Sequence, residues 1–232
     1  MSEANPEFDE LADEYHRLLH DPVRERFAPG GRFFALRKWR LVERYYQRTG
    51  RDLKGAAWLD VGCGFGELLG VGRGSVRRAA GCDRSPEMLR RCGDMDVSVQ
   101  PTAGALPYLD KSFDLVTAVC VFHHVEPSVR HKLVGEMSRV LAPRGVLCII
   151  EHNPLNPVTQ LIVRRTPVDA NARLLTAGAV RRLVRAERFA SVLTQYFLVF
   201  PEKLYGRAAE VEARLSGVPI GGQYAVFGSK PD

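Results

Sequence analysis

The segment Trp58–Leu69, WLDVGCGFGELL, constrains the fold of this chain more than any other stretch. It opens with a short apolar run and continues through Gly62, Gly64 and Gly66. A short apolar run followed by clustered glycines predicts a buried strand that enters a tight loop. Because glycine has no Cβ, the backbone of such a loop can approach a bound ligand closely. The segment therefore predicts a strand, a ligand-binding loop and the start of a helix.

Asp60 lies inside the apolar run, two positions before the first glycine. A carboxylate near the end of a buried strand is costly unless it has partners. Asp60 therefore either orients the amides of the glycine loop or contacts a cationic or amino-bearing ligand. The alternative is an ordinary strand–turn–helix corner without a ligand, and the remainder of the chain has to decide between these interpretations.

After the glycine loop, apolar runs alternate with helical segments, which is typical of a parallel sheet with right-handed crossovers. Ser85 and Thr176 are expected N-caps, because their hydroxyls can accept hydrogen bonds from the free amides of a first helical turn. We predict strands at residues 57–61, 76–82, 97–99, 113–121, 146–150, 191–200 and 223–228. We predict helices at residues 67–72, from 85 onward, and at 128–141, 176–185 and 201–215.

Two segments depart from this alternation. Residues 7–50 are predicted to be helical, with breaks at Asp21-Pro22 and Pro29–Gly31 and a second helix over residues 32–48. Residues 151–171 contain three prolines and form a long connection for a compact domain, so we expect them to be functional or partly helical.

Length and composition restrict the class of protein. A chain of 232 residues fits one α/β domain. No run of eighteen apolar residues is present, so we expect no membrane span. The acidic, polar N-terminus lacks the basic-then-apolar pattern of a secretory signal, which predicts a cytoplasmic enzyme. None of the five cysteines forms a C-x-x-C pair or a zinc-type cluster, so we expect reduced thiols and no metal site.

The net charge of +6 could attract phosphate-rich partners. The basic residues are nevertheless interspersed with acidic ones, and no aromatic-rich basic motif of the RNA-binding type is present. We therefore expect a small-molecule partner and no nucleic acid, and we leave the choice between monomer and homodimer open.

The pattern Asp60-x-Gly62-x-Gly64-x-Gly66 resembles motif I of the class I S-adenosylmethionine-dependent methyltransferases. The dinucleotide fingerprint would require a glycine where Glu67 stands. Two further stretches are similar to the same family, namely LP at 106–107 with KSFDLV at 111–116, and CVFHHV at 120–125. The resemblance extends from about Leu11 to the C-terminus.

This resemblance implies an α/β, Rossmann-like fold. Its seven-stranded sheet would be mostly parallel, with an antiparallel C-terminal hairpin at one edge and helices on both faces. The domain would span residues 1–232, with an N-terminal helical lid over 1–50 and the core over 51–232. The implied cofactor is S-adenosyl-L-methionine, with S-adenosyl-L-homocysteine as the product.

Residues at strand ends are the candidates for cofactor binding, because ligands bind at the carboxyl ends of parallel strands. Asp83, about twenty positions past the glycine loop, can accept both ribose hydroxyls. In the family pattern Met88 packs on adenine, and Thr102 stands where an aspartate often binds the adenine amino group. Lys38 follows an aromatic pair and could pair with the cofactor carboxylate. The full set of expected cofactor contacts is Lys38, Asp60, Gly62, Cys63, Gly64, Gly66, Asp83, Arg84, Met88, Thr102, Ala103, Cys120 and Val121.

Candidate catalytic residues follow the fourth and fifth strands. His123 belongs to a histidine pair that is frequent in this family, so a purely structural role is the competing interpretation. Glu151 and His152 end a predicted central strand, where polar side chains are costly without a role. His152 is the leading general base, because histidine suits that role near neutral pH. We expect the acceptor pocket to be shaped by residues 163–175 and 196–200 together with Tyr15, Phe33 and Phe34, and we leave open whether Arg164 and Arg165 bind an anionic acceptor.

The sequence therefore predicts a methyltransferase that modifies an O, N or C centre of a small organic molecule, as a tailoring enzyme of a biosynthetic pathway does. Two alternatives belong to other classes. One is a methyltransferase for RNA or protein. The other is a cyclase or isomerase that keeps the cofactor and transfers no methyl group, since a sulfonium can stabilise developing negative charge.

Overall fold

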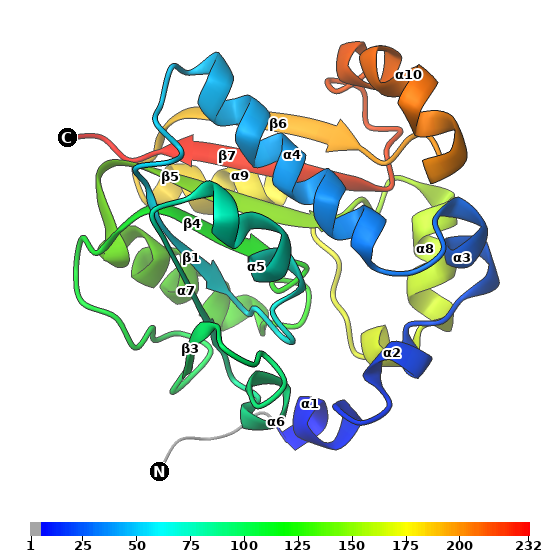
Figure 1. Ribbon diagram of the computed structural model, residues 1–232, viewed down its shortest axis with the longest axis horizontal. Coiled ribbons are helices and arrows are strands. Elements are labelled where there is room, and N and C mark those ends of the chain that lie inside the picture. Colours follow the sequence, from blue (N-terminus) through cyan, green and yellow to red (C-terminus); the bar gives the residue numbers. More distant parts are fainter. Residues whose placement is uncertain (1–5) are drawn as a thin grey trace.

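The computed structural model describes residues 6–232, which form one sheet with helices on both faces (Figure 1). Seven strands of the described residues pair in the order β3-β2-β1-β4-β5-β7-β6. β1 to β5 run parallel, and β7 is antiparallel to both β5 and β6. The predicted sheet with its antiparallel edge hairpin is confirmed. The strands are β1 Ala57–Val61, β2 Arg78–Asp83, β3 Asp96–Val99, β4 Phe113–Val119, β5 Leu141–His152, β6 Ala190–Phe197 and β7 Gln223–Ser229.

Side-chain caps define where several helices begin. Asp21, Ser85, Asn156 and Thr176 each accept a hydrogen bond from a backbone N–H of the helix that follows. The predicted caps at Ser85 and Thr176 are confirmed. The α-helices are α1 Pro6–Leu11, α2 Tyr15–Leu18, α3 Pro22–Phe27, α4 Arg32–Arg48, α5 Glu67–Gly72, α6 Pro86–Leu89, α7 Pro127–Val140, α8 Pro157–Arg165, α9 Ala177–Ala186 and α10 Glu202–Arg214, with 3-10 turns η1 Arg73–Ser75 and η2 Pro167–Asp169.

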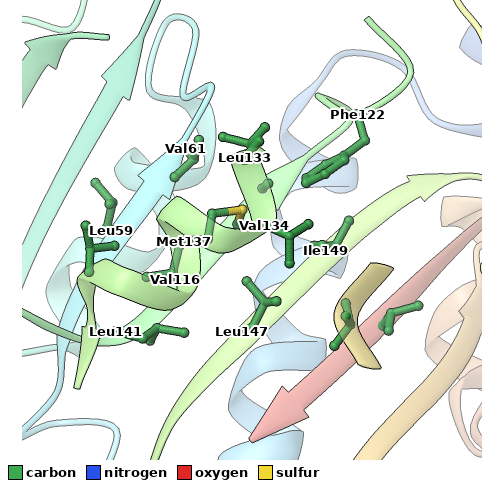
Figure 2. Close-up of a cluster of buried hydrophobic side chains, with 14 of the residues drawn as sticks. Leu59, Val61, Val116, Phe122, Leu133, Val134, Met137, Leu141, Leu147 and Ile149 are labelled. Atoms are coloured by element: carbon green, nitrogen blue, oxygen red, sulfur yellow. The ribbon is translucent and has the colours of Figure 1, made fainter. Parts of the chain in front are cut away.

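Alternation along the strands divides the core into two layers. Leu59 and its neighbours on one face pack against α7 and α9, as Figure 2 shows for the side chains around Met137. Trp58, one residue earlier, faces the opposite layer, where it packs with α4 and α5. Asp60 shares the face of Trp58 because strand side chains repeat every two residues. The carboxylate therefore points to the side of the sheet that α4 covers.

Some element boundaries differ from the prediction. β5 extends from Leu141 to His152 rather than over 146–150, because it pairs with β4 on one side and with β7 on the other. β4 ends at Val119 because Cys120 has a φ of 56°, which turns the chain out of the strand. The long connection after β5 contains α8 and η2, so the prediction of partial helix there is confirmed.

Among the residues that the structure describes, no helix has both the length and the apolar character needed to cross a membrane. All five cysteines are free thiols.

A buried ion pair joins helix α4, in the N-terminal part of the chain, to helix α10, in the C-terminal part. Arg37 of α4 pairs with Glu212 of α10, and its guanidinium also donates to the Tyr205 hydroxyl. The second oxygen of the Glu212 carboxylate accepts the backbone N–H of Val199 at 2.9 Å and that of Phe200 at 3.3 Å. Burial lowers the pKa of Arg37 to about 10, against the raising effect of Tyr205. This cluster ties α4, α10 and the segment after β6 together.

We expect Glu212→Gln to lower the free energy of unfolding by about 3–5 kcal/mol, because it leaves the Arg37 charge buried without a counter-ion. Urea denaturation followed by circular dichroism measures this loss. Asp96→Asn is the matched control, since the Arg78–Asp96 pair is exposed and such pairs contribute about 0–1 kcal/mol. Equal losses in the two variants would contradict a special role for the buried pair.

Candidate cofactor and acceptor site

A cavity of about 970 Å³ lies at the carboxyl ends of the parallel strands. It is lined by the glycine loop, by the ends of β2, β4 and β5, and by residues of α8. The N-terminal helices close it from another side through residues that include Tyr15, Phe34 and Lys38. Its volume is at the upper end of the range of about 300–1,000 Å³ for ligand sites, which leaves room for a cofactor together with an acceptor.

The glycine loop presents its backbone to this cavity. Gly62 and Gly64 have φ values of 70° and 52°, a region that favours glycine. A Cβ on Gly62 would lie 2.4 Å from Cγ2 of Val121, whereas a Cβ on Gly64 would meet only the Met88 sulfur at 3.7 Å. Gly62 is therefore required for packing, while the absent Cβ of Gly64 keeps space free for a ligand.

Gly66 was expected among the cofactor contacts, but it does not line the cavity. It adopts a left-handed conformation with a φ of 74° at the N-cap of α5, next to Met95. Its role in the structure is to turn the chain from the loop into the helix. The motif correctly predicts a glycine at this turn, but Gly66 does not reach the cavity in which the cofactor is expected to bind.

Asp83 connects the glycine loop to the loop after β2. Its carboxylate accepts the N–H of Gly64 at 2.8 Å and the N–H of Ser85 at 2.9 Å. Burial raises the pKa of Asp83, although these backbone donors act in the opposite direction. The backbone N–H of Arg84 also donates to this carboxylate. A carboxylate offers about four acceptor positions, so three backbone donors leave acceptor capacity for a hydroxyl group of a ligand in the cavity. This arrangement fits the predicted contact with a ribose.

Asp60 does not bind the glycine loop. The amides of Gly62 and Cys63 donate to the carbonyl of Cys82 instead, at 2.7 and 3.0 Å. Asp60 accepts the Thr117 hydroxyl at 2.5 Å and lines the cavity. Burial raises its pKa to about 7, while the Thr117 hydrogen bond and the charge of Lys38 lower it. Of the two roles predicted for Asp60, its position favours contact with a cationic or amino-bearing ligand.

Residues that were expected to contact adenine also line the cavity. Thr102 lines the cavity, but its hydroxyl accepts the N–H of Gly104 at 3.3 Å, so its local role is to shape the turn. Gln100, which sequence reasoning did not single out, lines the same region and donates to the Thr102 carbonyl. The other residues predicted to contact the cofactor that line this cavity are Cys63, Arg84, Met88, Ala103, Cys120 and Val121.

His123 is held by two carboxylates. Its Nδ1 lies 2.5 Å from Glu151, which also accepts the N–H of Phe122, and its Nε2 lies 3.4 Å from Asp169. Burial lowers the pKa of His123, but the two carboxylates outweigh burial and place this pKa well above its ordinary value. Burial raises the pKa of Glu151, yet the charge of His123 keeps it below its ordinary value. Both residues therefore carry charge at neutral pH.

Glu151 was expected among the catalytic residues, but it is fully buried and does not line the cavity. It can act only through His123, as a positioning residue. Asn153 is likewise engaged, because its amide donates to the carbonyls of Pro219 and Gly221. His152 differs from both, since it lines the cavity and its Nδ1 lies 3.5 Å from the Gln223 amide.

His152 and His123 have opposite charge states. Their rings lie 5.2 Å apart between centroids. Burial, together with the positive charge on His123, lowers the pKa of His152 to about 4. At neutral pH the His152 imidazole is therefore uncharged and can accept a proton.

Asp169 is a site residue that sequence reasoning missed. Its carboxylate lies 3.4 Å from Nε2 of both His123 and His124, and these three ligand atoms all fall within 4.8 Å of one another. The spacing would accommodate a metal ion, but the Asp169 carboxylate already makes side-chain hydrogen bonds with both histidines. Its only signal in the sequence was its place in the long connection after β5.

The acceptor end of the cavity is mostly apolar. Of the aromatic residues predicted there, Tyr15 and Phe34 line it, whereas Phe33 is buried against Phe27 and Tyr205. Arg164 and Arg165 are exposed and lie outside the lining, so they do not reach an acceptor in this cavity. Apolar lining at this end comes from Leu19, Val23, Phe27, Val158, Ile162, Val163, Leu198, Val199 and Ile220.

Residues 59–149 match the family described as a methyltransferase domain. The fold is also that of a solved S-adenosylmethionine-dependent methyltransferase from Thermotoga maritima, described as a possible histamine N-methyltransferase. That structure has a TM-score of 0.71 at 19% identity and covers 97% of this chain and 99% of its own. The chain therefore carries a methyltransferase domain over residues 59–149 and has the Rossmann-like fold of the class I S-adenosylmethionine-dependent methyltransferases. Their cofactor is S-adenosylmethionine, and the open Gly64, the acceptor oxygens of Asp83 and the cavity volume fit that group.

Curated relatives of this chain include two proteins named for tRNA modification. The tRNA (carboxymethyluridine(34)-5-O)-methyltransferase of Arabidopsis thaliana is 28% identical over 69% of this chain and 38% of its own length. The probable tRNA methyltransferase 9B of Mus musculus is 32% identical over 57% of this chain and 29% of its own length. The chain thus spans less than half the length of these two relatives.

We expect Asp83→Asn to weaken the binding of S-adenosylmethionine by about 10–100-fold, because hydrogen bonds to a charged group contribute about 1.5–3 kcal/mol and an amide cannot replace all of the carboxylate's acceptors. Isothermal titration calorimetry measures the Kd. Asp94→Asn, which removes an exposed carboxylate near the same loops, is the control. An unchanged Kd in Asp83→Asn would remove Asp83 from the ribose site.

Proposed function

We propose that this methyltransferase transfers the methyl group of S-adenosylmethionine to an O, N or C centre of a small organic molecule, in a biosynthetic pathway. The observation that carries the proposal is the division of one cavity into two ends. The end at the glycine loop and Asp83 is polar, and the end at Phe34, α8 and Leu198 is mostly apolar. His152 lines the same cavity, so a proton acceptor is available to an acceptor molecule bound there.

S-adenosylmethionine, when bound, supplies a methyl group that is already activated on a sulfonium. The main task of the chain is then to hold the acceptor in line with that methyl group, and such positioning can contribute roughly 7–11 kcal/mol. The apolar lining excludes water from the acceptor end, and the N-terminal helices enclose it. No side chain has to form a covalent intermediate in this scheme.

His152 is the proposed general base for an acceptor that must lose a proton. Its imidazole is neutral at physiological pH because its pKa is about 4. His123 cannot take this role, since its raised pKa keeps it protonated and both of its ring nitrogens face carboxylates. His123 instead places a fixed positive charge next to His152, and Glu151 and Asp169 hold it in position.

An RNA acceptor is the second candidate, because the two curated relatives described above are named for tRNA modification. A nucleotide would have to bind among the apolar side chains of the acceptor end. The apolar lining therefore favours a small molecule. Binding of tRNA that weakens steeply with salt, together with methyl transfer to it, would favour the RNA function.

Calorimetric titration with S-adenosylmethionine, S-adenosylhomocysteine and NAD tests the cofactor, followed by transfer of a labelled methyl group to a panel of small molecules and to bulk tRNA. We expect both adenosyl compounds to bind, NAD not to bind, and label to appear in a small molecule. Label in tRNA alone would contradict the small-molecule proposal. Rearrangement of an acceptor without label transfer would support a cyclase or isomerase.

We expect His152→Gln to lower kcat by about 10²–10⁴-fold at neutral pH with little change in the Kd of S-adenosylmethionine, because it removes a base and leaves the cofactor end intact. In the parent enzyme, kcat should fall with acid only as pH approaches about 4, since protonation below that pKa removes the base. Steady-state kinetics across pH, with circular dichroism at each pH, checks both points. His131→Gln, on the exposed side of α7, is the control; an unchanged kcat in His152→Gln would mean that the transfer needs no base at this position.

A further inference from the structure

Exposed apolar side chains gather beside the mouth of the cavity. Five of them come from α8, the residues just before it and the loop that precedes β7, and they are between 41% and 58% exposed. We call them the rim patch. Its members are Leu155, Val158, Leu161, Val218 and Ile220.

The rim patch is built on fixed backbone. The Asn156 side chain caps α8 and also donates to the Ile220 carbonyl at 2.8 Å. Asn153 donates to the carbonyls of Pro219 and Gly221, and the Thr159 hydroxyl donates to Gly222. These hydrogen bonds join α8 to the loop before β7. The apolar side chains of the rim patch therefore come from two segments whose backbones are fixed relative to each other.

The packing of α8 leaves this face uncovered. Thr159 and Val163 are the buried residues of the helix, while Val158 and Leu161 lie on its exposed side. In an ordinary amphipathic surface helix the exposed side is polar. Exposed apolar residues that cluster in this way mark a site of interaction.

The charge around the rim patch is positive. Residues 155–165 contain no acidic residue and end in the exposed pair Arg164 and Arg165. α3 lines the same cavity as α8 through Val23 and Arg24, and it carries two arginines and one glutamate. α10 begins with Glu202 and Lys203 and continues to Arg207. An apolar surface with a cationic margin is complementary to a bilayer that contains anionic lipids.

The rim patch is continuous with the cavity. Val158 and Ile220 belong to both, since each is half exposed and each lines the cavity. Ile162, on the next turn of α8, also lines it. A molecule that leaves an apolar phase at the patch therefore enters the acceptor end along apolar side chains.

We propose that the rim patch docks on an anionic lipid bilayer and that the methyl acceptor is a lipid-soluble molecule that passes from the bilayer into the cavity. The identity of the acceptor rests on the proposed methyl transfer, whereas the docking does not. Apolar contact and cationic attraction act together here, as stable peripheral binding requires two such signals.

Co-sedimentation of the full chain with vesicles tests the docking. The vesicles consist of phosphatidylcholine alone or of phosphatidylcholine mixed with phosphatidylglycerol. We expect binding to the mixed vesicles and much weaker binding to the neutral ones. Calorimetric titration of the same sample with S-adenosylmethionine reports separately on the cofactor site, so failure of the docking and failure of the proposed function remain distinguishable.

Two double variants separate the apolar and cationic contributions. Arg164→Gln with Arg165→Gln should lower partitioning into mixed vesicles by about 30-fold, because each cation near an anionic surface contributes about 1 kcal/mol and tenfold is 1.36 kcal/mol. Leu155→Ser with Leu161→Ser should lower partitioning at least about tenfold, since buried CH₂ groups contribute roughly 0.8 kcal/mol each. Neither leucine lines the cavity.

Matched controls are available on other surfaces. Arg182→Gln with Arg185→Gln removes two exposed charges from α9, and Leu109→Ser removes a leucine that is 82% exposed before β4. Both controls should bind vesicles as the parent does. The proposal is overturned if the chain binds neither kind of vesicle, or if the Arg182 and Arg185 variant loses as much binding as the Arg164 and Arg165 variant.

Normal binding by the leucine variant would also overturn it, because the surface would then recognise polyanions by charge alone. If the chain forms a dimer that the leucine variant abolishes, the rim patch is a dimer interface and the proposal is again overturned.

Discussion

The Asp83 carboxylate is the contact on which the cofactor site depends. It joins two loops that follow neighbouring strands, because one oxygen accepts the N–H of Gly64 and the other the N–H of Ser85. The glycine loop gains a fixed position relative to α6, and Met88 of that helix faces the open side of Gly64. A residue that first appears as a ligand contact therefore also builds the surface on which the ligand lies.

The two histidines at the reaction end illustrate how one fold sets opposite charge states a few ångströms apart. His123 is surrounded by Glu151 and Asp169 and stays protonated. His152 lies beside the Gln223 amide, and its burial and the positive charge of His123 keep it neutral. Environments that push the pKa values of neighbouring groups apart are a common basis for assigning acid and base roles. The roles proposed for His152 as a base and for His123 as a fixed positive charge follow from the groups around each ring, not from their places in the sequence.

Local signals in the sequence predicted much of the fold. The bounds of β1 and α5 were predicted correctly, because an apolar run and alternate glycines determine them within a dozen residues. Interactions between distant residues were not predictable in this way. Asp169 meets His123 from 46 positions along the chain, and Arg37 meets Glu212 from 175 positions away. The extent of β5 was missed for a related reason, since β7 pairs with it from the far end of the chain.

The Arg37–Glu212 pair also has a consequence for how ligands enter. Arg37 and Lys38 are neighbours on α4, and while Lys38 lines the cavity, Arg37 is locked into α10 and the segment after β6. Movement of α4 away from the sheet would expose or unpair a buried guanidinium, so this helix is a fixed wall. The remaining cover consists of α1, α2 and α3, three helices of four to six residues each. Exchange of cofactor and product is therefore expected to depend on these short helices, and its rate on how firmly Tyr15 and Phe34 hold them closed.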